Sequence, residues 1–205
     1  MYTAAFEKLP QEKQQTIINA GILCFGQYGY EKASISEIAK TAGISKAAVF
    51  LYFGTKQGML FYLIQYARKE LETLLEAVLV EDTDDYFVTM ERYHQVQLQL
   101  VKKHPGMYEF MRLAEEPVET TEDFEAIAQF MDECRAHDVN VFLAHVDWTK
   151  FREDIDRTTV LNMTTWIGNG CLTQLEKTLS LDELFAELAR YLGILKTMLY
   201  KPQYL

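Results

Sequence analysis

The sequence predicts an all-α protein, and three observations support this fold class. Only four prolines and ten glycines occur in 205 residues, so long stretches contain no helix breaker. Apolar residues recur at helical spacing, as Ile18, Ile22 and Phe25 do. Serine, threonine or aspartate stands where several of these stretches begin, as expected of helix N-caps. We expect about nine helices in total.

Four helices are expected before residue 81. The first runs roughly over 10–28, the second begins at residue 34, the third covers 46–53, and the fourth runs from 55 to about 80. Ser34 and Glu37 form an S-x-x-E capping box where the second helix begins. The start, turn and end signals are Pro10, Gly29, Ser34, Gly43, Ser45, Gly54 and Thr55.

The rest of the chain is expected to continue as helices. The expected ranges are 86–103, 107–115, a helix opening at Thr121, a helix from 156 to about 178, and a last helix ending near residue 200. Ser180 or Asp182 caps the last helix. Residues 147–152 are ambiguous, and a loop is one interpretation of them.

Charge is divided unevenly along the chain. The net charge is -10, but residues 1–60 hold six lysines and four glutamates, a net +2, which leaves -12 for the remainder. A small basic domain attached to an acidic body is typical of proteins whose contact with nucleic acid is confined to one face. No apolar run reaches membrane-spanning length, so a cytosolic location without membrane contact is expected.

Signals for metal, cofactor or catalytic chemistry are weak. The cysteines Cys24, Cys134 and Cys171 are widely spaced and match no zinc or redox pattern. No Gly-rich phosphate loop or nucleophile elbow occurs. We therefore expect no metal, no cofactor and no enzyme activity, and a helical enzyme is the remote alternative.

The most informative segment is ASISEIAKTAGISKAAVFLYF, residues 33–53. Two short capped helices joined by a glycine turn are typical of a helix-turn-helix, which places its second helix in the major groove of DNA. The motif proper is assigned to residues 34–53.

Residues 10–60 resemble the N-terminal domain of TetR-family transcriptional regulators. The residues that carry the resemblance are Ile35, Ile38, Ala39, Ala42-Gly43-Ile44-Ser45-Lys46, Tyr52-Phe53, Lys56 and Leu60. The resemblance implies a helix-turn-helix domain over 1–55 and a helical ligand-binding and dimerisation domain over 56–205. It further implies a homodimer on a palindromic double-stranded DNA operator, most simply a repressor that responds to a small effector.

The family pattern implies a set of DNA contacts and also shows where this chain departs from it. The implied contacts are Ser34, Ser36, Ser45, Lys46, Ala47, Tyr52 and Lys56. Ala48, Phe50 and Leu51 occupy positions where the family often has hydroxyl-bearing, polar or aromatic residues. We expect fewer hydrogen bonds per half-site, with Ala47 and Ala48 packing on thymine methyl groups.

Two further sets of residues are candidates in the body of the chain. An apolar or aromatic effector would be lined by Tyr93, Met107, Phe110, Met111, Phe130, Trp148 and Trp166. A four-helix dimer interface would use Val160, Met163, Ile167, Cys171, Leu184, Leu188, Tyr191 and Leu195. Ordinary core is the alternative for both sets. A DNA-binding protein with an architectural or positioning role and no ligand is the alternative function.

Overall fold

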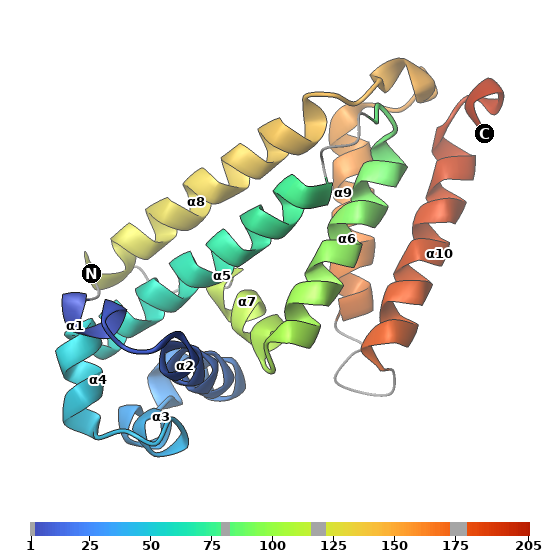
Figure 1. The fold of residues 1–205 in the computed structure, drawn as a ribbon. Helices are drawn as coiled ribbons and strands as arrows, with labels where there is room; N and C mark the ends of the chain where they lie inside the picture. The colour runs from blue at the N-terminus through green and yellow to red at the C-terminus, as the bar shows by residue number, and fades with distance from the viewer. Residues whose placement is uncertain (1–2, 79–82, 116–121, 173–179) are drawn as a thin grey trace. The chain divides into compact units, whose positions relative to one another are not determined.

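A computed structural model describes residues 3–78, 83–115, 122–172 and 180–205, and all its regular elements in these ranges are helices (Figure 1). The predicted all-α fold class is confirmed. The described residues form ten α-helices and two short 3-10 helices, together with one isolated antiparallel bridge between Phe151 and Tyr200.

The first five helices follow the predicted pattern with one addition. They are α1 (Ala4–Glu7), α2 (Gln11–Lys32), α3 (Ile35–Thr41), α4 (Lys46–Phe53) and α5 (Lys56–Val78). The hydroxyls of Ser34, Ser45 and Thr55 each accept a backbone N–H three residues on, at 3.4, 3.1 and 2.9 Å. These three serine and threonine caps are therefore confirmed.

Helix α1 was not expected, and α2 extends beyond its expected end. Four residues are too few to show helical periodicity, and α1 is held instead by Phe6, whose ring centroid lies 4.9 Å from that of Phe53. In α2 the backbone of Gly29 leaves the helical region, with φ 69° and ψ 171°, and a further turn then reaches Lys32. Glycine thus breaks the helix where predicted without ending it.

The second half contains α6 (Tyr86–Lys103), α7 (Met107–Glu115), α8 (Glu122–Leu143), η1 (Trp148–Lys150), α9 (Arg157–Leu172), α10 (Leu181–Leu199) and η2 (Pro202–Tyr204). Ser180 rather than Asp182 caps α10, in a complete capping box with Glu183. The ambiguous stretch 147–152 contains the 3-10 turn η1. Thr121 and the expected end of the helix near residue 178 lie outside the described residues.

The chain divides into two compact units. The first comprises Met1–Leu74 and Gln99–His137, and the second comprises Leu75–Leu98 and Asp138–Leu205. The predicted domain boundary between residues 55 and 56 falls inside the first unit, which includes α5 as far as Leu74 and all of α7. Packing across distant parts of the sequence therefore sets the division.

In the first unit, α2 packs closely against α7. A Cβ at Gly26 would lie 2.8 Å from the carbonyl oxygen of Gly106 and 3.0 Å from the backbone nitrogen of Phe110, so only glycine permits this approach. Nearby, Nδ1 of buried His104 lies 3.0 Å from Oδ1 of Asn19 on α2. These contacts join α2 to the end of α6 and the start of α7.

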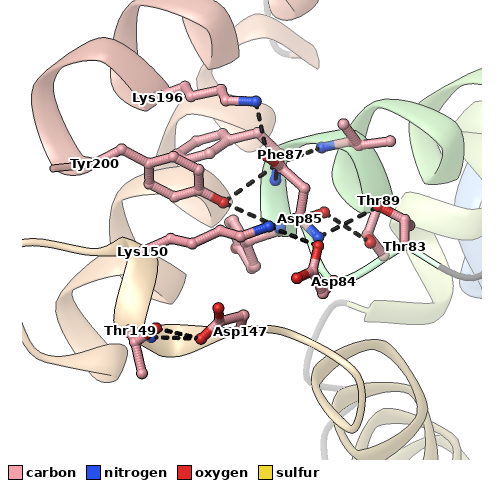
Figure 2. A network of polar contacts seen from close by, with 12 residues as sticks. Thr83, Asp84, Asp85, Phe87, Thr89, Asp147, Thr149, Lys150, Lys196 and Tyr200 are labelled. Atoms are coloured by element: carbon pink, nitrogen blue, oxygen red, sulfur yellow. Dashed lines mark hydrogen bonds and ion pairs between the residues drawn. The ribbon is translucent and has the colours of Figure 1, made fainter. Parts of the chain in front are cut away.

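In the second unit, Asp85 lies at the centre of a polar network at the start of α6 (Figure 2). Its Oδ1 accepts the backbone N–H groups of Phe87 and Val88 at 2.9 and 3.1 Å, which caps the helix. From α10 and its end, Lys196 Nζ donates to Oδ2 at 2.8 Å and the Tyr200 hydroxyl donates to Oδ1 at 3.2 Å.

The pKa of Asp85 reflects two opposing effects. Partial burial opposes ionisation, but the hydrogen bond from Lys196 and the N–H of Val88 outweigh it, so the pKa lies below its usual value. The ionised carboxylate therefore stabilises the junction of α6 with α10 at all pH values above the acid range.

No single helix among the described ranges is long and apolar enough to cross a membrane; only α4 and part of α5 together, bent by 64°, match by length and composition. The described residues also contain no group of three or more His, Cys, Asp or Glu side chains placed to hold a metal ion.

The Asp85 network generates a stability prediction. We expect Asp85→Ala to lower the free energy of unfolding by about 3 kcal/mol, because it removes a helix cap and leaves Lys196 without its carboxylate. Asp84→Ala makes the same change in charge at the neighbouring residue, whose side chain is 60% exposed and pairs with Lys150. This control should lose less than about 1 kcal/mol. Urea unfolding measures both, and equal losses would contradict the central place of Asp85.

Candidate nucleic-acid interface

The turn between α3 and α4 is fixed by its own backbone and by a side chain from α2. Gly43 has φ 62°, a left-handed conformation that favours glycine. The ammonium of Lys13 donates to the carbonyl oxygens of Ala42 and Gly43 at 2.8 and 3.3 Å. The carbonyls of the residue that caps α3 and of the turn glycine are thereby satisfied, and the turn is attached to α2.

The C-terminal end of α4 is held by residues at the start of the chain. The hydroxyl of Thr3 donates to the Leu51 carbonyl at 3.0 Å, and its backbone N–H donates to the Tyr52 carbonyl at 2.8 Å. At the other end, the Ser45 hydroxyl accepts the N–H of Ala48. Both ends of this eight-residue helix are therefore capped.

The seven predicted DNA-contact residues lie in α3 and α4, at the N-caps of these two helices, and at the first residue of α5. Ser34, Ser36, Ser45, Lys46 and Ala47 are exposed, and Tyr52 and Lys56 are half-buried. The ammonium of Lys46 lies 6.0 Å from the centroid of the Phe50 ring. Contact of these residues with DNA stays a prediction.

Lys56, which was predicted only as a phosphate contact, also makes contacts within the chain. Its ammonium donates to the Glu31 carbonyl at 3.1 Å and lies 4.6 Å from the centroid of the Tyr30 ring. Lys56 therefore ties the end of α2 to the start of α5.

Sequence reasoning missed the residues that support the motif, namely Thr3, Phe6 and Lys13. Thr3 and Lys13 contact backbone carbonyls 29 to 49 residues away in sequence, and no local pattern reports such a partner. The aromatic Phe6 ahead of the first predicted helix was the available signal, because a fully exposed phenylalanine would be unfavourable.

The seven predicted effector-lining residues are placed in both units. In the first unit, Met107 and Phe110 are buried core, Met111 is half-buried, and Phe130 makes an edge contact with Phe61 at 5.7 Å. In the second unit, Tyr93 is half-buried, Trp148 stacks on Phe151 at 5.2 Å, and Trp166 is 68% exposed.

The second unit contains a cavity of about 100 Å³ between α6 and α10. It is lined by Glu91, His94, Gln95, Leu98, Phe185, Ala189 and Leu192, a set that includes none of the seven predicted residues. Burial lowers the pKa of His94 to about 4, so its imidazole is neutral at pH 7.

The predicted dimer-interface residues lie on the expected helices, but most point into their own unit. Val160, Cys171, Leu184, Leu188 and Leu195 are buried in the core of the second unit, and Met163 and Ile167 pack against it. Tyr191 is exposed. Helical periodicity explains this outcome. It identifies the apolar face of each helix, and that face packs against the core of the same unit.

Comparison with known proteins identifies the helix-turn-helix. Residues 17–63 match the family model described as bacterial regulatory proteins, tetR family. Over these residues, which are about a quarter of the chain, the protein is similar to TetR-family regulators. This match includes the whole of α3 and α4 and agrees with the predicted resemblance.

Similar TetR-type proteins are named as regulators. The HTH-type transcriptional repressor AcnR of Corynebacterium glutamicum is 31% identical over 101 residues, which cover 49% of this chain and 53% of that protein. The uncharacterized HTH-type transcriptional regulator YuxN of Bacillus subtilis is 39% identical over 56 residues, 27% of this chain and 19% of that protein. The chain thus spans about half or less of the length of these relatives.

Solved TetR-type structures resemble the chain over most of its length. A TetR family regulator from Chloroflexus aurantiacus has a TM-score of 0.66 at 23% identity and covers 98% of this chain and 99% of its own. The fatty acid degradation regulator FadR from Bacillus halodurans has a TM-score of 0.67 at 19% identity and covers 87% and 96%. At these identities the likeness concerns the fold.

The contacts of Lys56 generate a second prediction. We expect Lys56→Met to lower the free energy of unfolding by about 1 kcal/mol, because it removes a hydrogen bond from a charged donor and a contact with an aromatic ring. Lys69→Met makes the same change at an exposed position of α5. This control should stay within about 0.5 kcal/mol of the parent chain. Chemical unfolding gives both values, and an unaffected Lys56→Met variant would show that the tie contributes nothing.

Proposed function

We propose that this chain is a DNA-binding transcriptional regulator that acts as a homodimer on a palindromic double-stranded operator, most simply as a ligand-responsive repressor in the cytoplasm. The observation that carries the proposal is the capped helix α4 with Ser45, Lys46 and Ala47 exposed at its N-terminal end. In a helix-turn-helix, this end of the second helix contacts base edges. The TetR-family match and the repressor AcnR among the relatives support it.

The proposed contacts divide into phosphate and base contacts. The hydroxyls of Ser34 and Ser36, with the ammonium of Lys56, would contact phosphates, because they stand at the starts of α3 and α5, where helix N-termini favour anions. The phenol of Tyr52 would add a phosphate contact. In the first turn of α4, the ammonium of Lys46 would reach a phosphate beside the groove, and Ala47 would lie closest to the bases.

Dimer formation is proposed to use outward-facing side chains of α9 and α10. Trp166, Tyr191, Ile194 and Met198 are 68, 37, 44 and 55% exposed. On α10, Tyr191, Ile194 and Met198 follow helical spacing and form one apolar strip. Such large apolar side chains on two neighbouring helices are typical of an interface with a second copy.

The effector is proposed to be a small, largely apolar or aromatic molecule. The cavity between α6 and α10 supports this proposal, because Leu98, Phe185 and Leu192 supply apolar walls while neutral His94 supplies a hydrogen-bonding group. Binding would change the separation of the two α4 helices in the dimer and so its fit to successive major grooves.

The DNA-binding proposal is tested by selecting binding sites from random duplexes with the full-length chain. We expect a palindromic preference, and we expect Lys46→Met to weaken binding and reduce the slope of log affinity against log salt by about 1, because one phosphate contact is lost. Lys69→Met should leave the slope unchanged. Absence of sequence-selective binding at both low and moderate salt would reject the function.

The dimer proposal is tested by sedimentation equilibrium. We expect the double variant Tyr191→Glu, Ile194→Glu to shift the chain to the monomer, because two carboxylates would be buried in an apolar interface. Ala186→Glu introduces a single carboxylate at an exposed position of α10 outside the apolar strip and should leave the dimer intact. A dimer that tolerates the double variant as well as the control would place the interface elsewhere.

A second candidate function is DNA binding with a positioning role and no effector. The nucleoid occlusion factor SlmA of Haemophilus influenzae is 27% identical over 135 residues, 64% of this chain and 60% of that protein. Operator affinity that no small molecule changes, together with binding sites spread along the chromosome, would favour this role. An enzyme role is the third candidate, and the named relatives weigh against it.

A further inference from the structure

The outward face of α4 carries an apolar strip. Val49 and Phe53 are buried at 1 and 2% exposure and attach the helix to the first unit, whereas Phe50 and Leu51 are 40 and 60% exposed. Ala47 is exposed as well. Residues 47, 50 and 51 stand at i, i+3 and i+4, so they share one face of the helix. We call Ala47, Phe50 and Leu51 the α4 strip.

The chemistry of the α4 strip limits what it can recognise. None of its three side chains donates or accepts a hydrogen bond, so the donor and acceptor pattern of the bases cannot be distinguished by the strip itself. Among the groups that the four bases present in the major groove, the C5-methyl of thymine is the apolar one. A strip of this kind in the groove would therefore favour T·A pairs over C·G pairs.

Charge around the strip favours an anionic partner. The Lys46 ammonium lies 6.0 Å from the Phe50 ring, and Lys40 is exposed on α3. Residues 1–60 carry a net +2 in a chain whose remainder carries -12. A partner that offers negative charge beside apolar methyl groups fits this surface, and duplex DNA offers both.

We propose that the α4 strip recognises thymine C5-methyl groups, so that this chain selects its operator by apolar contact rather than by hydrogen bonds from the centre of α4. The proposal rests on the DNA-binding function proposed above and adds the chemistry by which bases are distinguished. Lys46 and the serines position the helix on the backbone, and the strip supplies the choice of base.

Replacing thymine by deoxyuridine tests the proposal, because it removes the C5-methyl and leaves the hydrogen-bonding groups unchanged. A site selected from random duplexes is synthesised with each thymine replaced in turn, and affinity for the full-length chain is measured by fluorescence anisotropy. We expect about a four-fold loss at each thymine that contacts the strip, the value for one buried methyl-sized group, and no loss elsewhere.

Variants of the strip complete the test. Leu51→Ala and Phe50→Ala should bring the thymine-to-deoxyuridine affinity ratio at their positions to about 1, with the salt slope unchanged because no phosphate contact is lost. Leu23→Ala makes a matched change at a leucine of α2 that is 42% exposed and should keep the ratio. Thermal unfolding of each variant checks that the fold is retained. Leu51→Ala should disturb the fold less than Phe50→Ala, because Leu51 is the more exposed residue.

The outcomes separate this proposal from the function on which it rests. Selective binding that no deoxyuridine substitution weakens would overturn the strip's role and leave the regulator function standing. Absence of any selective binding would overturn both. A strip variant that dissociates the dimer instead of changing base preference would assign the strip to a second copy of this chain and would also overturn the proposal.

Discussion

An eight-residue helix forms too few internal hydrogen bonds to be stable by itself, and the candidate DNA interface depends on overcoming that limit in α4. Its start is capped by Ser45, and at its end the carbonyls of Leu51 and Tyr52 accept hydrogen bonds from the hydroxyl and the N–H of Thr3. The burial of Val49 and Phe53 adds hydrophobic stabilisation along its inner face. A helix held at both ends and along one side presents its outer side chains in one orientation, which base recognition requires.

The supports of α4 come from parts of the chain that do not belong to the helix-turn-helix itself. Lys13 on α2 holds the turn, and Phe6 packs among aromatic rings of α4 and α5. Lys56 joins the start of α5 to the end of α2. The motif is therefore one surface of a larger packed unit, and the compact division of the chain follows this packing rather than the limits of the motif.

Both units have an apolar core, and each also has polar contacts that join distant segments of the chain. In the first unit, the imidazole of buried His104 lies beside the half-buried side chain of Asn19 on α2. In the second, the carboxylate of Asp85 caps α6 and binds Lys196 and the end of α10, so that one charged group joins segments 111 residues apart. An acidic second unit can bury such a carboxylate because each of its oxygens has donors.

The helical class, the caps Ser34, Ser45 and Thr55 and the helix-turn-helix could all be predicted from local patterns in the amino-acid sequence. All of these depend on contacts within a few residues: the 3.6-residue period, a hydroxyl three residues before an N–H, and a glycine with positive φ at 43. Tertiary structure alone decided that α1 exists, that Leu184 and Leu188 face their own core while Tyr191 faces outward, and that Trp166 is exposed. Helical periodicity shows which side chains share a face of a helix. Only packing against distant segments determines whether that face meets the chain's own core or another molecule, so the effector and dimer residues could not be assigned from the spacing of apolar residues.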